Sequence, residues 1–286
     1  MDRKLVQPIK WHGGKHYLAP WIISHMPRHL HFVEPYFGGG SVLLARDLTR
    51  DWMATDGEKL PSYLRGCSEV VNDIHGELTN FWRVLQSPDD FQDFRRRVDA
   101  IPFSSVEWEE ATSQGDDPDQ IQMAVNFFVR ARQSRQGLMT VFATLTRNRT
   151  RRRMNEQASS YWTAVEGLAD VHKRLQQVVI LNQDAIQVIH QQDGQHTLFY
   201  CDPPYLHNTR ATTADYEHEM CQAEHEALLK TLSNTQGKFL LSGYRSELYD
   251  DYAATCGWRL EEREIDNKAS SRKSKEKKVE CLWMNF

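Results

Sequence analysis

The stretch that decides the fold reads Thr197-Leu198-Phe199-Tyr200-Cys201-Asp202-Pro203-Pro204-Tyr205. An apolar, aromatic run of this length favours a buried strand, and proline ends such a strand because it cannot donate to the hydrogen-bond ladder. The pattern therefore predicts a strand over 197–202 with a carboxylate, backbone carbonyls and a flat ring at its carboxyl end.

These groups suit chemistry on the exocyclic amine of a nucleobase. The lone pair of that amine is delocalised into the ring, so acceptors for its N–H bonds, which also stabilise the developing positive charge, would make it a better nucleophile. Asp202 and the carbonyl of Pro203 are the candidate acceptors, and Pro204 fixes the turn that presents the Tyr205 ring for stacking. The alternative is an ordinary turn, since Asp-Pro commonly starts turns and Pro-Pro-Tyr occurs in surface loops.

A glycine loop lies far upstream. The run 31–36 predicts a strand, Phe37-Gly38-Gly39-Gly40-Ser41 a turn, and 42–50 a helix with Ser41 as its N-cap. The loop lacks the dinucleotide pattern Gly-x-Gly-x-x-Gly, and Glu34 so close to it is poorly suited to a pyrophosphate. A ligand carrying positive charge, such as S-adenosylmethionine, fits better; the alternative is a glycine turn that binds nothing.

A second acid ends the next predicted strand, 69–73. Asp73 lies about where nucleoside-binding α/β proteins place the acid that holds the ribose hydroxyls. The same residues could instead cap the helix predicted over 75–86, and both roles could hold together.

Together these blocks resemble the Dam-like DNA adenine-N6 methyltransferases, in which the cofactor motif precedes the catalytic one. The resemblance also includes the N-terminal run 8–15, Pro-Ile-Lys-Trp-His-Gly-Gly-Lys. It departs from the usual pattern at His12, where a small residue is common, and at Tyr36, where phenylalanine is common. No match in the middle of the chain carries over a recognition sequence.

The resemblance implies S-adenosylmethionine as the cofactor and double-stranded DNA as the partner. It implies catalytic roles for Asp202, Pro203, Pro204 and Tyr205. It implies cofactor contacts by Trp11, Lys15, Glu34, Tyr36, Gly38, Gly40, Ser41, Asp73, Asp184 and Asp202. The target adenine must leave the duplex, and we expect the ring of Tyr205, rather than its hydroxyl, to hold the extruded base.

The expected architecture is an α/β fold with a doubly wound, mostly parallel seven-stranded sheet and an antiparallel last strand. The antiparallel strand is predicted because no helix separates the runs near 258–264 and 279–286. Residues from 88 to about 135 show helical spacing, and 133–155 reads as an exposed loop or hairpin. We therefore expect a catalytic domain from 1–76 and 176–286, and a mainly helical recognition domain inserted at 77–175.

Charge is distributed unevenly along the chain. The net charge of −4 is unusual for a DNA-binding protein, but a polyanion responds to local clusters. The alternative for each basic cluster is a solvated face. The residues expected to contact DNA are Lys10, Arg132, Arg135, Arg147, Arg149, Arg151, Arg152, Arg153, Lys273 and Lys275.

Other features narrow the class of protein. None of the 5 cysteines forms a Cys-x-x-Cys pair, so we expect reduced thiols and no zinc site. No apolar stretch is long enough to span a membrane, and a cytoplasmic, metal-free, monomeric enzyme is expected. Two alternatives remain open, an RNA adenine methyltransferase and a non-catalytic DNA-binding relative.

Overall fold

The computed structural model describes residues 5–47, 52–53, 61–62, 65–113, 115, 119–206, 220–266 and 277–286. The elements of the amino-terminal part are α1 (Ala19–Ser24), β1 (His31–Glu34), α2 (Ser41–Ala45), β2 (Ser68–Asn72), α3 (Gly76–Gln86), α4 (Pro88–Ala100), α5 (Ser105–Ser113), α6 (Gln120–Gln133) and the short 3-10 helix η2 (Arg135–Gly137). The remainder comprises β3 (Thr150–Arg151), β4 (Met154–Asn155), α7 (Glu156–Leu175), β5 (Val178–Leu181), α8 (Ala185–Gln192), β6 (Thr197–Cys201), α9 (Gln222–Leu232), β7 (Lys238–Gly243), α10 (Glu247–Cys256), β8 (Arg259–Asp266) and β9 (Lys277–Met284).

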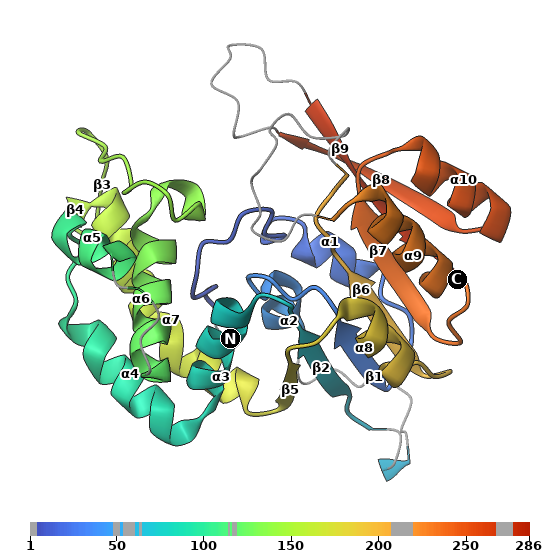
Figure 1. Ribbon diagram of the computed structural model, residues 1–286, viewed down its shortest axis with the longest axis horizontal. Coiled ribbons are helices and arrows are strands. Elements are labelled where there is room, and N and C mark those ends of the chain that lie inside the picture. Colours follow the sequence, from blue (N-terminus) through green and yellow to red (C-terminus); the bar gives the residue numbers. More distant parts are fainter. Residues whose placement is uncertain are drawn as a thin grey trace. The chain divides into compact units, whose positions relative to one another are not determined.

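A seven-stranded sheet in the order β5-β2-β1-β6-β7-β9-β8 forms the centre of the α/β fold (Figure 1). Strand β1 pairs in parallel with β2 and β6, and β6 pairs in parallel with β7. The last strand, β9, is antiparallel to both β7 and β8. The mostly parallel sheet with an antiparallel last strand is therefore confirmed.

The order of the sheet reverses between β1 and β6. From β1 the chain moves outward to β2, and after β5 it returns to β6 and moves outward on the other side to β7. In doubly wound sheets, ligands bind outside the carboxyl ends of the strands at this switch point. Glu34 ends β1, and Asp202 directly follows β6.

The central strands β1, β6 and β7 are buried because their sequences are largely apolar on both faces. Every residue of β6 is buried, and Phe32, Phe199 and Leu240 on three adjacent strands are fully buried. Continuous apolar runs of this kind are typical of parallel strands covered on both sides.

The middle of the chain is helical, as predicted. Helices α3, α4, α6 and α7 enclose an aromatic core that includes Phe81, Phe94, Phe127, Phe128 and Tyr161. The predicted loop or hairpin over 133–155 contains η2 and the small antiparallel pair of β3 and β4.

Several boundaries differ from the sequence predictions for identifiable reasons. The strand expected over 31–36 ends at Glu34, because Pro35 has no N–H to donate. The helix expected over 42–50 ends at Ala45, because Arg46 is extended. The short helix α1, which buries Ala19 and Ile22, was missed.

The chain divides into two compact units. The first comprises residues 1–23, 37–47 and 73–182, and the second comprises 24–36, 48–72 and 183–286. The glycine loop and the amino-terminal segment thus group with the helical middle. The division into catalytic and recognition domains concerns function, and it stays a prediction.

Among the described residues, no helix is both long and apolar enough to cross a membrane. Within the same residues, no group of three His, Cys, Asp or Glu side chains is arranged to hold a metal ion.

Candidate active site

The glycine loop, residues 37–41, has a backbone that other residues would not adopt easily. Gly38 and Gly40 have φ values of 51° and 68°, in the left-handed region. A Cβ on Gly38 would lie 2.9 Å from Nε1 of Trp11, and a Cβ on Gly40 would lie 2.9 Å from Cζ of Phe37. Both positions therefore require glycine for conformation and for space.

Side chains distant in sequence hold the carbonyls of this loop. Gln7 donates through Nε2 to the carbonyl of Gly39 at 2.9 Å and to the hydroxyl of Ser41 at 3.0 Å. The indole of Trp82 donates to the carbonyl of Gly38 at 3.1 Å. The sequence interpretation missed Gln7 and Trp82, because a lone glutamine and a core tryptophan carry no motif.

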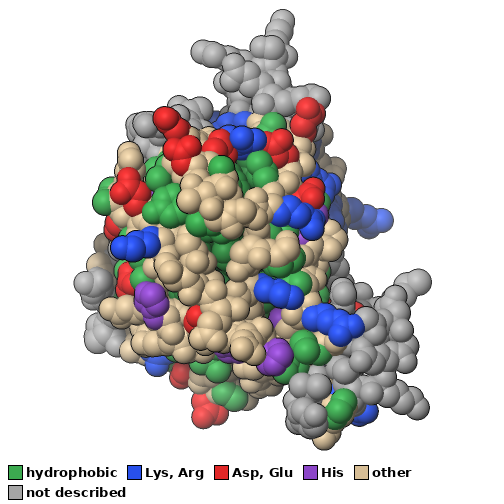
Figure 2. All heavy atoms as spheres, turned by 90° about the vertical axis from the view of Figure 1, so that its right-hand side faces the viewer, with side chains coloured by type: hydrophobic (Ala, Val, Ile, Leu, Met, Phe, Trp, Pro, Cys, Tyr) green, Lys and Arg blue, Asp and Glu red, His purple; other side chains and the backbone are tan. Residues whose placement is uncertain are grey.

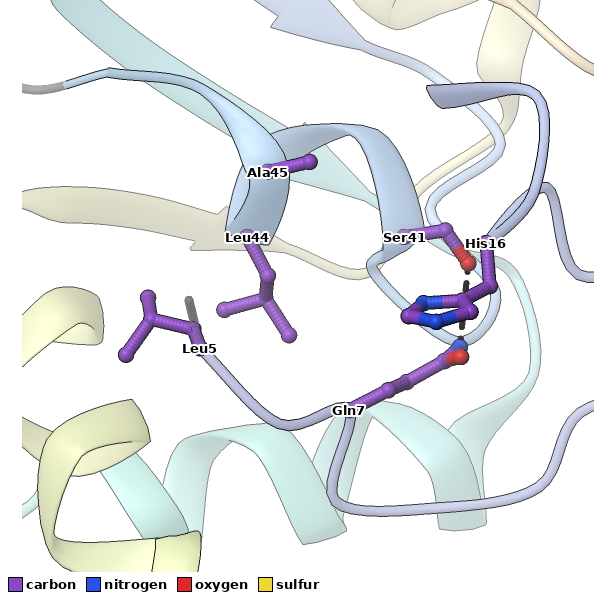
Figure 3. Close-up of a pocket in the computed structure, with 6 residues that line it drawn as sticks. All are labelled: Leu5, Gln7, His16, Ser41, Leu44 and Ala45. Carbon is purple, nitrogen blue, oxygen red and sulfur yellow. Dashed lines mark hydrogen bonds between the residues drawn. The ribbon is translucent and has the colours of Figure 1, made fainter. Parts of the chain in front are cut away.

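Figure 3 shows Gln7 pointing along its hydrogen bond to Ser41, at the first turn of α2. These two residues line a small pocket together with Leu5, His16, Leu44 and Ala45. Of these lining residues, Gln7 and Ser41 form the hydrogen bond that anchors the loop.

Asp73 holds the same loop from the other direction. Its Oδ2 accepts a hydrogen bond from the N–H of Gly38 at 2.8 Å, and its Oδ1 accepts one from the N–H of His75 at 3.0 Å. The N-cap of α3 is His75, whose ring accepts from the N–H of Leu78. A carboxylate can accept more than two hydrogen bonds, so the predicted contact with ribose is compatible with this geometry.

The amino-terminal motif lies against the glycine loop. The ring of Trp11 packs against the loop backbone and lies edge-on to His75, with centroids 5.9 Å apart. Lys15 is 7% exposed and donates through Nζ to the carbonyl of Gly13 at 3.2 Å. The first unit therefore brings Trp11, the glycine loop and Asp73 together, and their contacts with a cofactor stay a prediction.

The remaining residues predicted to bind the cofactor or to act in catalysis belong to the second unit. Glu34 is 2% exposed at the end of β1. Tyr36 is half-buried, and its pKa is raised well above 10.0 by burial and then by Cys201 and Tyr249, so its hydroxyl stays protonated.

Asn72 fastens the strand ends of this unit. Its side-chain amide donates to the carbonyls of Pro35 and Gln183, each at 3.0 Å, and its Oδ1 accepts from the N–H of Gln183 at 2.9 Å. The next acid, Asp184, is exposed and caps α8 by accepting from the N–H of Gln187 at 3.0 Å. Its predicted contact with the cofactor adenine stays a prediction.

The turn 202–205 follows β6 and carries the residues predicted to be catalytic. Asp202, Pro204 and Tyr205 are half-buried, and Pro203 is buried. The hydroxyl of Tyr205 donates to the carboxylate of Glu280, and its ring lies edge-on to Tyr244 with centroids 4.8 Å apart. The sequence interpretation missed Glu280; the signal that could have found it is an acid inside the apolar strand run 279–284.

The predicted DNA contacts fall into distinct environments. Arg132 is 7% exposed and donates to the carbonyl of Ser160 at 2.6 Å, which favours an internal role joining α6 to α7. Lys10 is half-buried and donates to Gln157 at 3.2 Å. Burial and then the charge of Arg132 lower the Lys10 pKa to about 8.

The other predicted arginines are exposed on the loop and hairpin that follow α6. Arg152 forms an ion pair with Glu166 at 2.6 Å, and Arg149 lies 3.9 Å from Glu156. Lys273 and Lys275 lie outside the described residues. The other exposed arginines among the predicted DNA contacts are Arg135, Arg147, Arg151 and Arg153.

A different part of the surface carries mixed charge. On the face over α9 and α10 seen in Figure 2, acidic and basic side chains lie among one another. No broad field of a single sign covers the described residues of that face. A polyanion would find less attraction there than at the arginine-rich hairpin.

The sequence is similar to those of known DNA adenine methyltransferases. The sequence profile of the D12 class N6 adenine-specific DNA methyltransferases matches residues 11–268. The chain is also similar to the DNA adenine methylase of Vibrio cholerae serotype O1, in two strains, with 33% identity over 79 residues. The matched segment spans 28% of this chain and 22% of each relative's length.

Proposed function

Because the chain belongs to the D12 class N6 adenine-specific DNA methyltransferase family, we propose that it transfers a methyl group from S-adenosylmethionine to the N6 amine of adenine in double-stranded DNA. The observation that carries the proposal is Asp202, at the carboxyl end of the buried strand β6 and beside the switch point of the sheet.

The residues of the first unit fit the proposed cofactor. The glycine loop offers backbone without side chains, and Asp73 at a strand end is suited to ribose hydroxyls. In the second unit, the buried carboxylate of Glu34 is suited to a positively charged ligand. When bound, S-adenosylmethionine supplies a methyl group on a sulfonium, which needs no metal ion to activate it.

The turn 202–205 would hold the acceptor. Asp202 would accept one N–H bond of the adenine amine, and the carbonyl of Pro203 would accept the other. Hydrogen bonds of this kind favour tetrahedral geometry at nitrogen and stabilise the positive charge that develops there. The ring of Tyr205 would stack on the base after it leaves the duplex, and stacking offsets part of the cost of extrusion.

The tip of the hairpin supports the DNA part of the proposal. Arg152 and Arg153 join β3 to β4 with φ values of 56° and 61°. Positive φ at both central residues is the feature of a type I′ turn, which strongly prefers Asn-Gly. A non-glycine residue in this conformation costs about 1–2 kcal/mol. Arg152 forms an ion pair with Glu166, and the exposed guanidinium of Arg153 is placed where it could contact a phosphate.

Replacing Asp202 by alanine tests the chemistry. We expect methyl transfer to unmethylated plasmid DNA to fall by about a hundred- to a thousandfold, because the variant lacks a hydrogen bond that stabilises transition-state charge. DNA affinity should be largely retained. The control is Asp251→Ala, which removes an exposed acid from α10 in the same unit.

The measurement is transfer of radiolabelled methyl groups under single-turnover conditions, followed by sequencing of the modified plasmid. An active Asp202→Ala enzyme would overturn the proposed mechanism. A parent enzyme that methylates RNA but not DNA would replace the proposed substrate, and a parent that binds DNA without transferring methyl groups would make the protein a binding relative.

Replacing Arg153 by glycine tests the hairpin. The variant should be more stable, by about 1 kcal/mol, because glycine relieves the left-handed strain. It should nevertheless bind DNA more weakly. The slope of log affinity against log salt should become shallower by about 0.9, because one phosphate is no longer neutralised by an arginine. Thermal unfolding and salt titrations measure the two effects.

The control for the hairpin is Arg96→Ala, which removes an exposed arginine from α4. Its salt slope should match that of the parent. If Arg153→Gly also keeps the parental slope, Arg153 belongs to a solvated face and makes no phosphate contact.

A further inference from the structure

The tip of the catalytic turn is tied to the last strand of the sheet. The hydroxyl of Tyr205 donates to the carboxylate of Glu280 on β9. In the register of the sheet, Gly243 at the end of β7 pairs with Cys281, the residue after Glu280. The antiparallel course of β9 therefore brings an acid close to the carboxyl ends of the neighbouring parallel strands.

Glu280 is an unusual occupant of its position. Its side chain is 2% exposed, and the four residues that follow it, Cys281 to Met284, are also buried. Burying a carboxylate costs free energy unless it gains strong hydrogen bonds. An apolar residue would suit this strand better if the position served packing alone, so the acid points to a role for its contact with Tyr205.

The donor in this contact keeps its proton. The pKa of the Tyr205 hydroxyl is raised well above 10.0 by burial, then by Asp202 and by Glu280. An ionised phenolate would lie between two acidic side chains, so the neutral hydroxyl is strongly favoured. Tyr205 can therefore donate to Glu280 at neutral pH.

Two contacts fix the ring of Tyr205. The hydroxyl is held at the far end of the ring by Glu280, and the ring itself meets the edge of Tyr244. Tyr244 in turn lies under the ammonium of Lys278, which is 4.9 Å from the ring centroid. A ring held at its tip and along its side has one orientation, as a stacking platform requires.

We propose that Glu280 is a positioning residue for methyl transfer, which holds Tyr205 so that the turn 202–205 keeps Asp202 and the stacking ring in their working arrangement. This inference rests on the proposed function. It also revises the expectation that only the ring of Tyr205 matters, because the hydroxyl is the group that Glu280 holds.

Four variants test the inference, namely Glu280→Gln, Glu280→Ala, Tyr205→Phe and the double variant Tyr205→Phe/Glu280→Gln. We expect Tyr205→Phe and Glu280→Ala each to slow single-turnover methylation by roughly ten- to a hundredfold, the range for removing a charge-assisted hydrogen bond. Glu280→Gln keeps an acceptor of the same size and should retain more activity than Glu280→Ala. The double variant should be no slower than the slower of its two single variants.

The chain offers matched controls for both substitutions. Tyr161→Phe removes the hydroxyl of another buried tyrosine, which donates to the carbonyl of Ile101 at 3.1 Å. Glu262→Gln removes an exposed acid from β8, where it pairs with Arg245 at 3.0 Å. Both control variants should methylate at rates within about threefold of the parent, because neither contact reaches the turn.

The decisive readouts separate positioning from folding. Dissociation constants for S-adenosylmethionine and for unmethylated plasmid DNA should change little in Glu280→Gln, while the methylation rate falls. The double-mutant cycle consists of the parent, Tyr205→Phe, Glu280→Gln and the double variant. Their free energies of unfolding should be non-additive, which would show that Tyr205 and Glu280 are coupled. That coupling is measurable without activity, so it tests the contact even if the parent transfers no methyl groups.

The outcomes are distinct. A parent enzyme without methyl transfer would remove the proposed function. Within an active parent, Tyr205→Phe at the parental rate, additive losses in the double variant, or equal losses of rate and of both affinities would each overturn the positioning role. A rate loss confined to the Tyr205 and Glu280 variants, with non-additive effects, supports it.

Discussion

The glycine loop and the turn 202–205 both follow a buried parallel strand, yet they are fixed in different ways. The loop is held through its backbone, with Gln7 and Trp82 donating to its carbonyls and Asp73 accepting from its N–H. The turn is held through a side chain, the hydroxyl of Tyr205 on Glu280.

This difference follows from what each segment presents. A loop that receives a ligand on its backbone has no side chains to spare, so it must be positioned by groups from elsewhere. A turn that works through an acid and a ring can be positioned through the ring itself. Substitutions should therefore act on the loop through backbone geometry and on the turn through side-chain chemistry.

Among substitutions that act on the glycine loop, the largest effect is expected from Asp73→Ala. The variant lacks the acceptor for the N–H groups of Gly38 and His75, which are 2.8 Å and 3.0 Å away. We expect S-adenosylmethionine to bind more weakly by about 1.5–3 kcal/mol, the range for hydrogen bonds to a charged group. Isothermal titration calorimetry measures the affinity.

Asp184→Ala is the matched comparison for Asp73→Ala, since Asp184 also follows a strand and accepts from a backbone N–H. Because Asp184 is the N-cap of α8, replacing it by alanine should lower the free energy of unfolding by about 1 kcal/mol. An unchanged cofactor affinity in Asp73→Ala would remove Asp73 from the site, and a reduced affinity in Asp184→Ala would support the predicted contact of that acid with the cofactor.

A smaller effect is expected from Gly39→Ala. A Cβ at this position would lie 2.7 Å from Cβ of Trp11 and would also collide with Nε2 of Gln7. Relieving the overlap should shift the loop away from the side chains that hydrogen-bond to it. The free energy of unfolding should fall by about 1–3 kcal/mol, as it does in overpacked proteins. Cofactor affinity should fall with it, while binding of DNA is retained.

Gly76→Ala is the control for this glycine, because a Cβ on Gly76 meets nothing within 4 Å. It starts helix α3 and should leave stability unchanged or raise it by up to about 1 kcal/mol. If Gly39→Ala were as stable as Gly76→Ala, the loop backbone could move to accommodate a Cβ more easily than its close contacts with Trp11 and Gln7 indicate.

The sequence predicted the elements that depend on local pattern. The alternating runs gave the seven-stranded sheet, and the absence of a helix between the last two runs gave the antiparallel β9. Asp73 and the glycine loop were also singled out, because strand-end acids and consecutive glycines are local signals, and the two are in contact; their roles toward a cofactor stay predictions. Helix α1 was too short to show a period.

The missed contacts depend on which distant segments meet. Gln7 reaches the glycine loop across 32 positions of sequence, and Tyr205 reaches Glu280 across 75. No periodicity encodes such pairs. Burial was equally hidden, since Arg132 stands in a run of arginines and only the packing of α6 against α7 separates it from its exposed neighbours.

The smallest effect is a difference in pH response between the two segments. In the amino-terminal segment that packs on the loop, burial and then Arg132 lower the Lys10 pKa to about 8 from 10.5. Around the turn, burial raises the pKa of Tyr205 and of Tyr200 well above 10.0. From about pH 7 to about pH 9, Lys10 should therefore lose its proton while both tyrosines keep theirs.

If Lys10 contacts a phosphate, DNA favours its charged form, so affinity should fall as pH rises through 8, by at most about tenfold at pH 9. With saturating DNA, the methylation rate should not change between about pH 7 and pH 9 through loss of a proton from Tyr200 or Tyr205. Lys10→Arg stays charged and should remove the pH dependence of binding, whereas Lys10→Gln should bind weakly at every pH. Filter binding at constant ionic strength measures the affinities, with Lys230→Gln on α9 as the control.

A parental affinity that is flat over this range would place Lys10 outside the DNA contact, and its lowered pKa would then act only on folding. Because the folded protein binds fewer protons at Lys10 than the unfolded chain between about pH 8 and pH 10.5, that contribution to stability increases with pH across the window.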